Sequence, residues 1–395
     1  MPSNPLKVVE TTEVLIVGGG PAGLAAAIAL GQRGIECTVV EARSTPIDKA
    51  CGEGLMPDSR ESLAQLGVSL GEQDGYLFHG IRFENAMHHV DARFPHGAGI
   101  GVRRPHLHGL LTARAEQTGA RLFWNSHIQL SADSAADSPA RSTALVNGQP
   151  LHFRWLIGAD GQASSVRHWA GLDRTRSRGL RYGFRTHYRI DPATTRFDMV
   201  EVHWGRGGQL YLTPVAPDCV CAVYLTRDQH RISADNRSDI LAEFPRISDR
   251  LAGAEIVSRQ RGAITASRKL DRVATDSVAL IGDASGSADA ITGEGLAIGF
   301  RQALALADAI HSGSLEAYRR AHRQIGKLPI AMGELMLTLD RWPALQVRAL
   351  RALATTPVFF QELLQAHMGA RSLASVLVRR GPRFGWSLLR NGAHA

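Results

Sequence analysis

A glycine-rich turn between two short apolar runs restricts the possible folds of this chain more than any other feature. The run 14–17 leads into the turn, a helix is predicted from about 22 to 32, and the run 37–40 ends at Glu41. In G-x-G-x-x-G spacing, the glycines allow a tight turn, close approach of backbone amides to a pyrophosphate, and close helix–strand packing, while the acid holds ribose hydroxyls. The stretch therefore predicts a βαβ unit that binds a dinucleotide. Its glycines are Gly18, Gly20 and Gly23.

The length and composition of the chain suit one broad α/β body or two closely joined domains. With 395 residues, of which 44% are apolar, it can bury a large core. The first residues lack the charged and apolar regions of a secretory leader, and no stretch reaches the roughly 18 consecutive apolar residues of a membrane span. A cytoplasmic location is therefore expected.

The charge and the cysteines exclude several classes of function. The net charge is +8, and 41 of the 45 basic residues are arginines scattered along the chain without a nucleic-acid motif. Nucleic acid is therefore not expected as a partner, although the charge favours anionic ligands. The four cysteines are too few for a disulfide framework and lack zinc spacing, so we expect buried thiols and no metal.

The pattern of apolar residues predicts how the rest of the chain is organised. Strands are expected around 126–130 and 144–158, with a surface loop at 131–143, and helices follow after 292. Between about 180 and 265, alternating and β-rich runs predict one antiparallel sheet. A nucleotide-binding body assembled from separated segments would thus carry a β-rich insertion.

Two later stretches, taken with the first turn, carry a resemblance to a known group of enzymes. They are LIGADGQASSVRHWAGL at 156–172 and SVALIGDASGSADAITGEGLAIGF at 277–300. With these three motifs in this order, residues 12–310 or so resemble the p-hydroxybenzoate hydroxylase and geranylgeranyl reductase superfamily of FAD enzymes. The resemblance implies an α/β fold, in which a Rossmann-like FAD-binding domain carries a β-rich substrate-domain insertion and C-terminal helices. It also implies FAD as cofactor and NAD(P)H as a transient electron donor.

The resemblance further implies three parts of the chain. Segments 1–74, 101–178 and 270–325 would form a discontinuous FAD-binding domain. Segments 75–100 and 179–269 would form the β-sheet substrate domain. Residues 326–395 would form a C-terminal helical region.

The family motifs assign roles to individual residues. Asp283, at the end of a strand expected beside the first one, is similar in position to the acid that binds the flavin-side ribose. Asp160 matches an acid near the pyrophosphate. Arg104 matches an arginine that reaches the FAD phosphates, with Arg103 as its rival. A surface ion pair or a strand-end turn is the plainer interpretation of each. The full set of expected cofactor-binding residues is Gly18, Gly20, Pro21, Ala22, Gly23, Glu41, Ala42, Arg43, Cys51, Gly52, Arg104, Ile128, Asp160, Gly161, Gly282, Asp283, Gly293, Gly295 and Leu296.

The tetrapeptide GEGL occurs twice, at 52–55 and at 293–296. In relatives, the later turn faces one edge of the flavin ring, where backbone amides and a helix dipole stabilise negative charge. The earlier copy falls where relatives bring a loop against the other side of the ring. We expect the two copies to converge on one flavin, the alternative being coincidence in a glycine-rich chain.

Three branches of the superfamily differ in their reaction. Halogenases need a lysine soon after the first loop, and this chain has none between Lys49 and Lys269. Geranylgeranyl reductases carry a Cys-Gly at the flavin, as here, but YLTPVAP at 211–217 keeps only the outline of their aromatic strand. The predicted function is therefore an FAD-dependent monooxygenase that acts through a C4a-hydroperoxide on an aromatic or apolar small molecule of specialised metabolism. A geranylgeranyl-reductase-like ene reductase is the alternative; a halogenase or a non-catalytic flavin carrier ranks lower.

No catalytic side chain is assigned firmly. Glu53 and Glu294 are weak candidates for general bases, with capping or backbone hydrogen bonding as the plainer interpretation. Cys51 is a candidate through the reductase resemblance. Tyr211 fits either the cavity wall or packing within the sheet.

The C-terminal region after about 312 departs from the superfamily. The segment 371–395 has five arginines and no acid, with apolar residues between them, and Pro382 is expected to interrupt it. A helix that caps the substrate cavity, an oligomer contact and peripheral contact with a membrane all fit this pattern. The expected partners are a small aromatic or prenyl-like substrate and, as an alternative electron source, a separate flavin reductase; the oligomeric state stays open.

Overall fold

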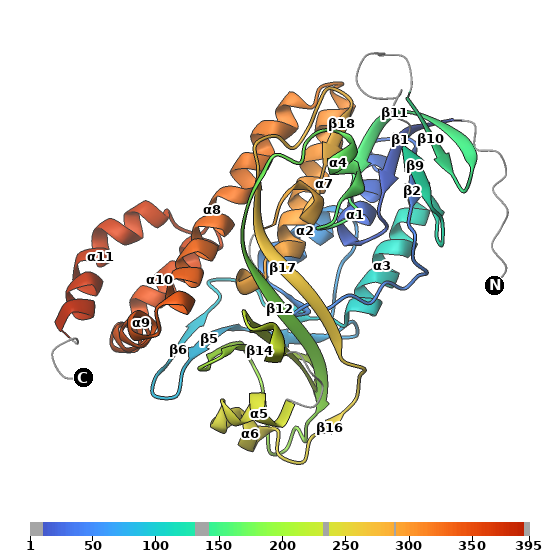
Figure 1. Ribbon diagram of the computed structural model, residues 1–395. Coiled ribbons are helices and arrows are strands. Elements are labelled where there is room, and N and C mark those ends of the chain that lie inside the picture. The colour runs from blue at the N-terminus through green and yellow to red at the C-terminus, as the bar shows by residue number, and fades with distance from the viewer. Residues whose placement is uncertain (1–10, 131–141, 232–236, 288–289, 391–395) are drawn as a thin grey trace.

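The computed structural model describes residues 11–130, 142–231, 237–287 and 290–390 (Figure 1). The dinucleotide-type body lies at one end, a large sheet lies below it, and the last helices extend to the side opposite the N-terminus. Most of the expected loop at 131–143 falls outside the described residues. Among the described helices, none is both long and apolar enough to cross a membrane.

The first sheet is the parallel sheet expected of a dinucleotide-binding body. Its strands follow the order β8-β2-β1-β11, with β18 pairing on β11, and β10 and β9 continue the other edge antiparallel. Because both faces of the parallel strands are covered, they are short apolar runs rather than alternating ones. The strands are β1 (Thr11–Val17), β2 (Cys37–Val40), β8 (Arg121–Phe123), β9 (Ile128–Leu130), β10 (Ser142–Val146), β11 (Gln149–Gly158) and β18 (Val278–Leu280).

Three helices cover one face of this sheet. The first, α1 (Pro21–Gly31), is buried over nearly its whole length and packs against α3 (Arg104–Gln117) and α7 (Gly295–His311). The predicted helix at 22–32 is therefore confirmed to within one residue. On the other side, the short α4 (Ser165–Trp169) follows β11.

The second sheet has eight strands in the order β16-β12-β15-β14-β13-β5-β6, with β17 also pairing on β12. The predicted antiparallel sheet between about 180 and 265 is confirmed, because every strand pair within that stretch is antiparallel. Outside that stretch, β5 adds to β13 in parallel. β5 comes from an earlier part of the chain, so no tight hairpin forces it to run antiparallel. The strands are β5 (Gly80–Glu84), β6 (His89–Arg93), β12 (Thr175–Arg189), β13 (Val200–Trp204), β14 (Gly208–Ala216), β15 (Cys219–Thr226), β16 (Glu255–Ile256) and β17 (Arg261–Leu270). Short helices α5 (Arg237–Ala242) and α6 (Pro245–Arg250) pack beside them.

A small three-stranded sheet joins the two bodies. It consists of β3 (Gly54–Leu55), β7 (Gly99–Gly101) and β4 (Tyr76–Phe78), and α2 (Pro57–Gln65) follows β3. At Gly101 the backbone lies so close to β14 that an added Cβ would be 1.8 Å from the carbonyl oxygen of Pro214. The contact between the small sheet and β14 therefore requires glycine, which has no side chain, at position 101.

Four helices complete the chain: α8 (Glu316–Arg341), α9 (Pro343–Thr355), α10 (Pro357–His367) and α11 (Leu373–Arg390). They share an apolar core with strands of the second sheet, including β6. The expectation that Pro382 interrupts the last segment was wrong, since α11 continues through it. The hydrogen bond that this proline removes would use the carbonyl of Val378, an exposed residue whose carbonyl water can satisfy. The predicted three-part division stays a prediction.

We expect Gly101→Ala to lower the free energy of unfolding by about 2 kcal/mol, because the new methyl group forces β7 away from β14. Chemical denaturation measures this change. Gly109→Ala in α3 is the matched control, because its Cβ would meet no atom within 4 Å and the change should be neutral or slightly stabilising. Equal stability of the two variants would contradict the close approach.

Candidate functional site

The carboxyl ends of four parallel strands bring the predicted cofactor residues to one edge of the first sheet. Loops 18–20, 41–43, 159–161 and 282–285 follow β1, β2, β11 and β18. One detail of the prediction was wrong: the strand before Asp283 was expected beside β1, but β11 lies between them. The edge where parallel strands end is where such sheets bind ligands.

The three glycines of the first turn have different physical roles. A Cβ at Gly18 would lie 2.4 Å from the carbonyl oxygen of Ala159, and one at Gly23 would lie 1.9 Å from that of Gly18. Packing alone requires these two glycines. A Cβ at Gly20 would meet no protein atom within 4 Å, and Gly20 begins α1 without a side-chain cap. The helix start, with Pro21 and Ala22 as its first residues, thus faces open space and suits an anion.

Glu41 closes this turn through backbone hydrogen bonds. Its carboxylate accepts from the N–H of Gly19 at 2.8 Å and from that of Arg43 at 2.9 Å, with Ala42 between. Sequence reasoning missed His108, a fully buried side chain of α3 whose Nε2 lies 2.9 Å from the carbonyl oxygen of Gly19. Burial lowers the pKa of His108, which favours the neutral ring. The signal for it was its position four residues after Arg104, on the same helix face.

Arg104, rather than Arg103, has the environment expected of a phosphate-binding arginine. Its side chain is buried, its Nη1 lies 4.0 Å from the sulfur of Cys51, and its Nε has no partner among the described residues. The Nε of Arg103 is also buried without a hydrogen-bond partner among the described residues, but it lies 3.8 Å from Glu53 and the side chain is 39% exposed. An anionic ligand would satisfy the unpartnered nitrogen of Arg104.

Asp160 uses one carboxylate oxygen for structure and leaves the other free. Its Oδ2 accepts hydrogen bonds from the backbone N–H and hydroxyl of Ser165 and from the N–H of Val166, at the start of α4. Its Oδ1 is buried without a partner in the described part of the chain. The adjacent Gly161 has a φ of 83° and open space where a Cβ would stand.

The turn after β18 is held from two helices. The N–H of Gly282 donates to Gln302 of α7 at 2.8 Å, and the Nε2 of His322 in α8 lies 2.9 Å from the hydroxyl of Ser285. Burial lowers the pKa of His322 to about 4. Asp283 itself is a third exposed and lies 3.2 Å from the Nζ of Lys49. No motif in the sequence predicted that α8 would take part.

Glu53 is the centre of a buried polar cluster. Its carboxylate accepts from the N–H of Arg104 and from Nη1 of Arg185, each at 2.9 Å, and its other oxygen lies 2.7 Å from Nε2 of His187. The side chain has no exposed surface, and its φ is 59°. These contacts indicate that Glu53 connects separate elements of the fold by hydrogen bonds, rather than acting as a general base.

The same cluster contains the one group that could resemble a metal site among the described residues: Glu53, His187 and Cys221 have ligand atoms within 4.8 Å of one another. Burial raises the pKa of the Cys221 thiol well above its ordinary value. The guanidinium of Arg185 already balances the carboxylate. A neutral thiol and a neighbouring cation disfavour a metal ion. The absence of a metal remains a prediction.

Glu294 also pairs with a distant histidine. Its Oε1 lies 3.2 Å from Nε2 of His367 in α10, and its Oε2 is buried without a partner among the described residues. Burial alone would lower the pKa of His367, but the hydrogen bond and charge of Glu294 outweigh it and raise the pKa. The second GEGL turn is thus attached to the C-terminal helices.

Strand β14 brings the two GEGL turns together. The hydroxyl of Tyr211 donates to the carbonyl of Ile291 at 2.9 Å, two residues before Gly293. A Cβ at Gly54 would lie 3.3 Å from Cγ2 of Thr213. Tyr211 and Thr213 alternate along the strand and so share one face. Both turns therefore meet the same face of β14, and Tyr211 positions one of them.

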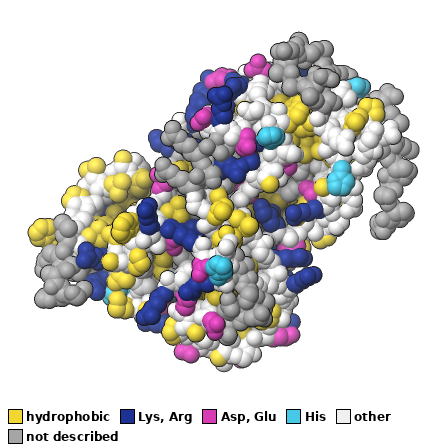
Figure 2. Space-filling view, in the orientation of Figure 1, with side chains coloured by type: hydrophobic (Ala, Val, Ile, Leu, Met, Phe, Trp, Pro, Cys, Tyr) yellow, Lys and Arg dark blue, Asp and Glu magenta, His cyan; other side chains and the backbone are white. Residues whose placement is uncertain are grey.

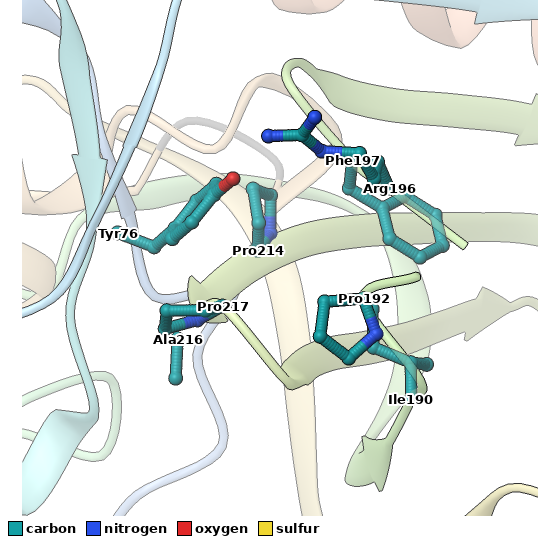
Figure 3. Close-up of a pocket in the computed structure, with 8 residues that line it drawn as sticks. All are labelled: Tyr76, Ile190, Pro192, Arg196, Phe197, Pro214, Ala216 and Pro217. Atoms are coloured by element: carbon teal, nitrogen blue, oxygen red, sulfur yellow. The ribbon is translucent and has the colours of Figure 1, made fainter. Parts of the chain in front are cut away.

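A separate small pocket lies where the second sheet meets β4 (Figure 3). It has a volume of about 110 Å³, which is too small for a dinucleotide, and none of the predicted cofactor residues lines it. The Tyr76 hydroxyl and the Arg196 guanidinium both point toward one side of this pocket. The remaining lining residues are Ile190, Pro192, Phe197, Pro214, Ala216 and Pro217.

The residues around the strand ends fit an FAD molecule by three observations. Buried polar atoms of Arg104, Asp160 and Glu294 lack partners in the described residues. Open space stands where Cβ atoms would be at five predicted positions, namely Gly20, Gly52, Gly161, Gly293 and Gly295. Ile128 packs on the core beside the ends of β1 and β2, and Leu296 packs against the core of the first body. The individual cofactor contacts remain predictions.

A dinucleotide-binding sheet joined to a large second sheet defines the class of two-body flavoenzymes. The family comparison makes this specific: residues 11–318 match the FAD binding domain family, and the chain belongs to that family. FAD is its cofactor, and the protein is an FAD-dependent oxidoreductase. The predicted resemblance and fold class are thereby confirmed.

Relatives in sequence include both reductases and monooxygenases. Menaquinone reductase of Mycobacterium tuberculosis is 33% identical over 170 residues, which are 41% of this chain and 40% of that protein. The menaquinone reductase of Mycolicibacterium smegmatis is 26% identical over 93% of this chain and 90% of its own length. Chloroplastic geranylgeranyl diphosphate reductase of Arabidopsis thaliana is 27% identical over 83% and 70%. Rifampicin monooxygenase of Rhodococcus hoagii is 28% identical over 40% and 33%.

Solved structures share the fold at low identity. A flavoprotein/dehydrogenase from Cytophaga hutchinsonii superposes with a TM-score of 0.77 at 16% identity, covering 91% of this chain and 92% of its own. p-Nitrophenol 4-monooxygenase from Pseudomonas putida gives 0.74 at 17% identity, covering 90% and 97%. At these identities the likeness concerns the fold alone.

We expect Asp283→Asn to weaken FAD binding about tenfold, because a neutral amide loses a charge-assisted hydrogen bond to the ribose. The measurement is FAD titration of the flavin-free protein. Asp308→Asn, on an exposed part of α7, is the matched control and should bind FAD as the unmodified protein does. Unchanged affinity in Asp283→Asn would remove this residue from the proposed site.

We expect Glu53→Gln to lower the free energy of unfolding by about 2 kcal/mol, because Arg185 loses one of its two carboxylate partners and keeps Asp48. Glu255→Gln breaks an exposed ion pair and should cost less than 1 kcal/mol. Denaturation and turnover are measured on the same samples. If Glu53 were instead a general base, its variant would keep its stability and lose only turnover.

Proposed function

We propose that this FAD-dependent oxidoreductase reduces a carbon–carbon double bond in an apolar, prenyl-like small molecule. The observation that carries the proposal is the extent of the match to the M. smegmatis menaquinone reductase, which aligns with 93% of this chain. That length includes the second sheet and most of the C-terminal helices, where the substrate would bind. Menaquinone and geranylgeranyl diphosphate, named for two relatives, both carry an isoprenoid chain.

Monooxygenation of an aromatic or apolar molecule is the second candidate. It was the first choice from sequence, and the similarity to rifampicin monooxygenase supports it. That similarity covers only 40% of this chain, too little to include both the first sheet and the whole second sheet. The order of the two candidates is therefore reversed.

In either reaction the residues at the strand ends would bind and orient the cofactor. The start of α1 at Gly20 would bind the pyrophosphate, Glu41 one ribose, and Asp283 the flavin-side ribose. The two GEGL turns would lie on the flavin, held by β14. When bound and reduced by NAD(P)H or by a separate reductase, FAD would supply the hydride for saturation.

Saturation of a double bond needs one hydride and one proton, added to neighbouring carbons. Cys51 is the candidate proton donor of this chain. It is half-buried, and the guanidinium of Arg104 lies 4.0 Å from its sulfur. Cys37, by contrast, lies in the first sheet, where burial raises its pKa to about 12.

The test uses the FAD-loaded full chain under anaerobic conditions with NADH, NADPH or dithionite as reductant. Menaquinone and geranylgeranyl diphosphate are offered, and mass spectrometry should find product with two additional hydrogen atoms. A parallel reaction under ¹⁸O₂ tests the second candidate. Labelled oxygen in the product without saturation would contradict the proposal.

The matched variants are Cys51→Ala and Cys37→Ala. Loss of a positioned proton donor should slow saturation about a hundredfold in Cys51→Ala, with the rate expressed per bound FAD. Cys37→Ala should retain the rate of the unmodified protein. Equal rates for both variants would exclude Cys51 as the donor, and water would then supply the proton.

A further inference from the structure

Helix α11 presents an apolar face that the fold does not use. Its inner face packs into the core through Leu373, Val376 and Phe384. Val378, Pro382 and Trp386 recur every four residues and so lie in one line along the opposite side. Val378 is 79% exposed and Trp386 is 62% exposed.

This line belongs to a wider concentration of exposed apolar residues. Of the twelve large apolar side chains exposed among the described residues, eight lie after position 326, in about a sixth of the chain. Figure 2 shows yellow side chains gathered over the C-terminal helices, with dark blue ones between them. The eight are Ile330, Leu335, Trp342, Leu345, Val358, Leu377, Val378 and Trp386. Exposed apolar clusters of this kind mark contact surfaces.

The same part of the chain carries nearly all of its net charge. Residues 341–390 contain eight arginines and one acid, Glu362, which gives +7 of the +8 of the whole chain. Glu362 is already in contact with Arg371, Arg379 and Arg380. Arg383 is exposed and follows Pro382 directly, so it lies beside the apolar line.

We propose that this C-terminal surface binds an anionic lipid bilayer, with α11 lying along the interface. Val378, Pro382 and Trp386 enter the headgroup region, and the surrounding arginines meet lipid phosphates. Tryptophan is favoured at that depth because its ring is apolar and its N–H is polar. The inference stands independently of the proposed reaction, although an apolar prenyl substrate would be found in the same bilayer.

Two observations favour a lipid surface over a protein partner. A partner helix packs best on apolar residues that alternate three and four apart, whereas this line repeats every four and is one residue wide. The positive charge is spread along the segment 341–390, from the end of α8 to the end of α11. A uniformly anionic plane matches both features.

The experiment measures co-sedimentation of the FAD-loaded full chain with phosphatidylcholine vesicles that contain about a third of phosphatidylglycerol, and with phosphatidylcholine alone. Binding should be at least tenfold tighter to the anionic vesicles and should weaken as salt is raised. Equal binding to both vesicle types, or none to either, would overturn the proposal.

Matched variants identify the surface. Val378→Ser/Trp386→Ser should weaken anionic-vesicle binding about tenfold, whereas Met87→Ser/Leu180→Ser, also exposed, should not. Arg383→Glu should weaken it, and Arg206→Glu, with the same change in net charge, should have a clearly smaller effect. Bound flavin and thermal stability verify folding. A concentration-dependent dimer that disappears in Val378→Ser/Trp386→Ser, without vesicle binding, would assign the surface to a second copy instead.

Discussion

The two bodies of this protein meet around a single buried carboxylate. Glu53 belongs to the loop between the bodies, Arg104 to the cofactor body, and Arg185 and His187 to β12 of the second sheet. A buried carboxylate that lacks its partners is destabilising by several kcal/mol, so the three elements must meet at this point. Glu53 also holds a φ of 59°, a conformation that costs a non-glycine residue about 1 kcal/mol and that its hydrogen bonds sustain.

The two GEGL turns show how little a short sequence determines by itself. Glu53 has a positive φ and is followed by a strand, whereas Glu294 has a φ of −93° and begins α7. Yet both glutamates are buried, and each binds a histidine from a distant element, His187 in one case and His367 in the other. The shared feature is therefore the environment of the acid rather than the path of the backbone.

Local patterns in the sequence were sufficient to predict the βαβ unit and the strand ends that carry the family motifs. They were insufficient for the partners of those motifs. His187 lies 134 positions from Glu53, and His322 lies 37 positions from Ser285, so only the topology brings them together. Periodicity likewise predicts a strand before Asp283 without predicting which strand it pairs with. The prediction that Pro382 interrupts the last helix was wrong because the cost of a proline within a helix depends on which side of α11 faces water.

Helix α8 gives the C-terminal region a second connection to the cofactor body. Near its start, Tyr318 donates to the carbonyl of Leu280 and His322 reaches Ser285, while near its end Asp340 binds Arg181 and Gln209 of the second sheet. Some 22 residues of helix separate these contacts, a span of about 33 Å. Helix α8 thus contacts both bodies of the molecule. Deletion of the chain after α7 would therefore weaken FAD binding, although the deleted residues near Asp340 lie far from the proposed cofactor site.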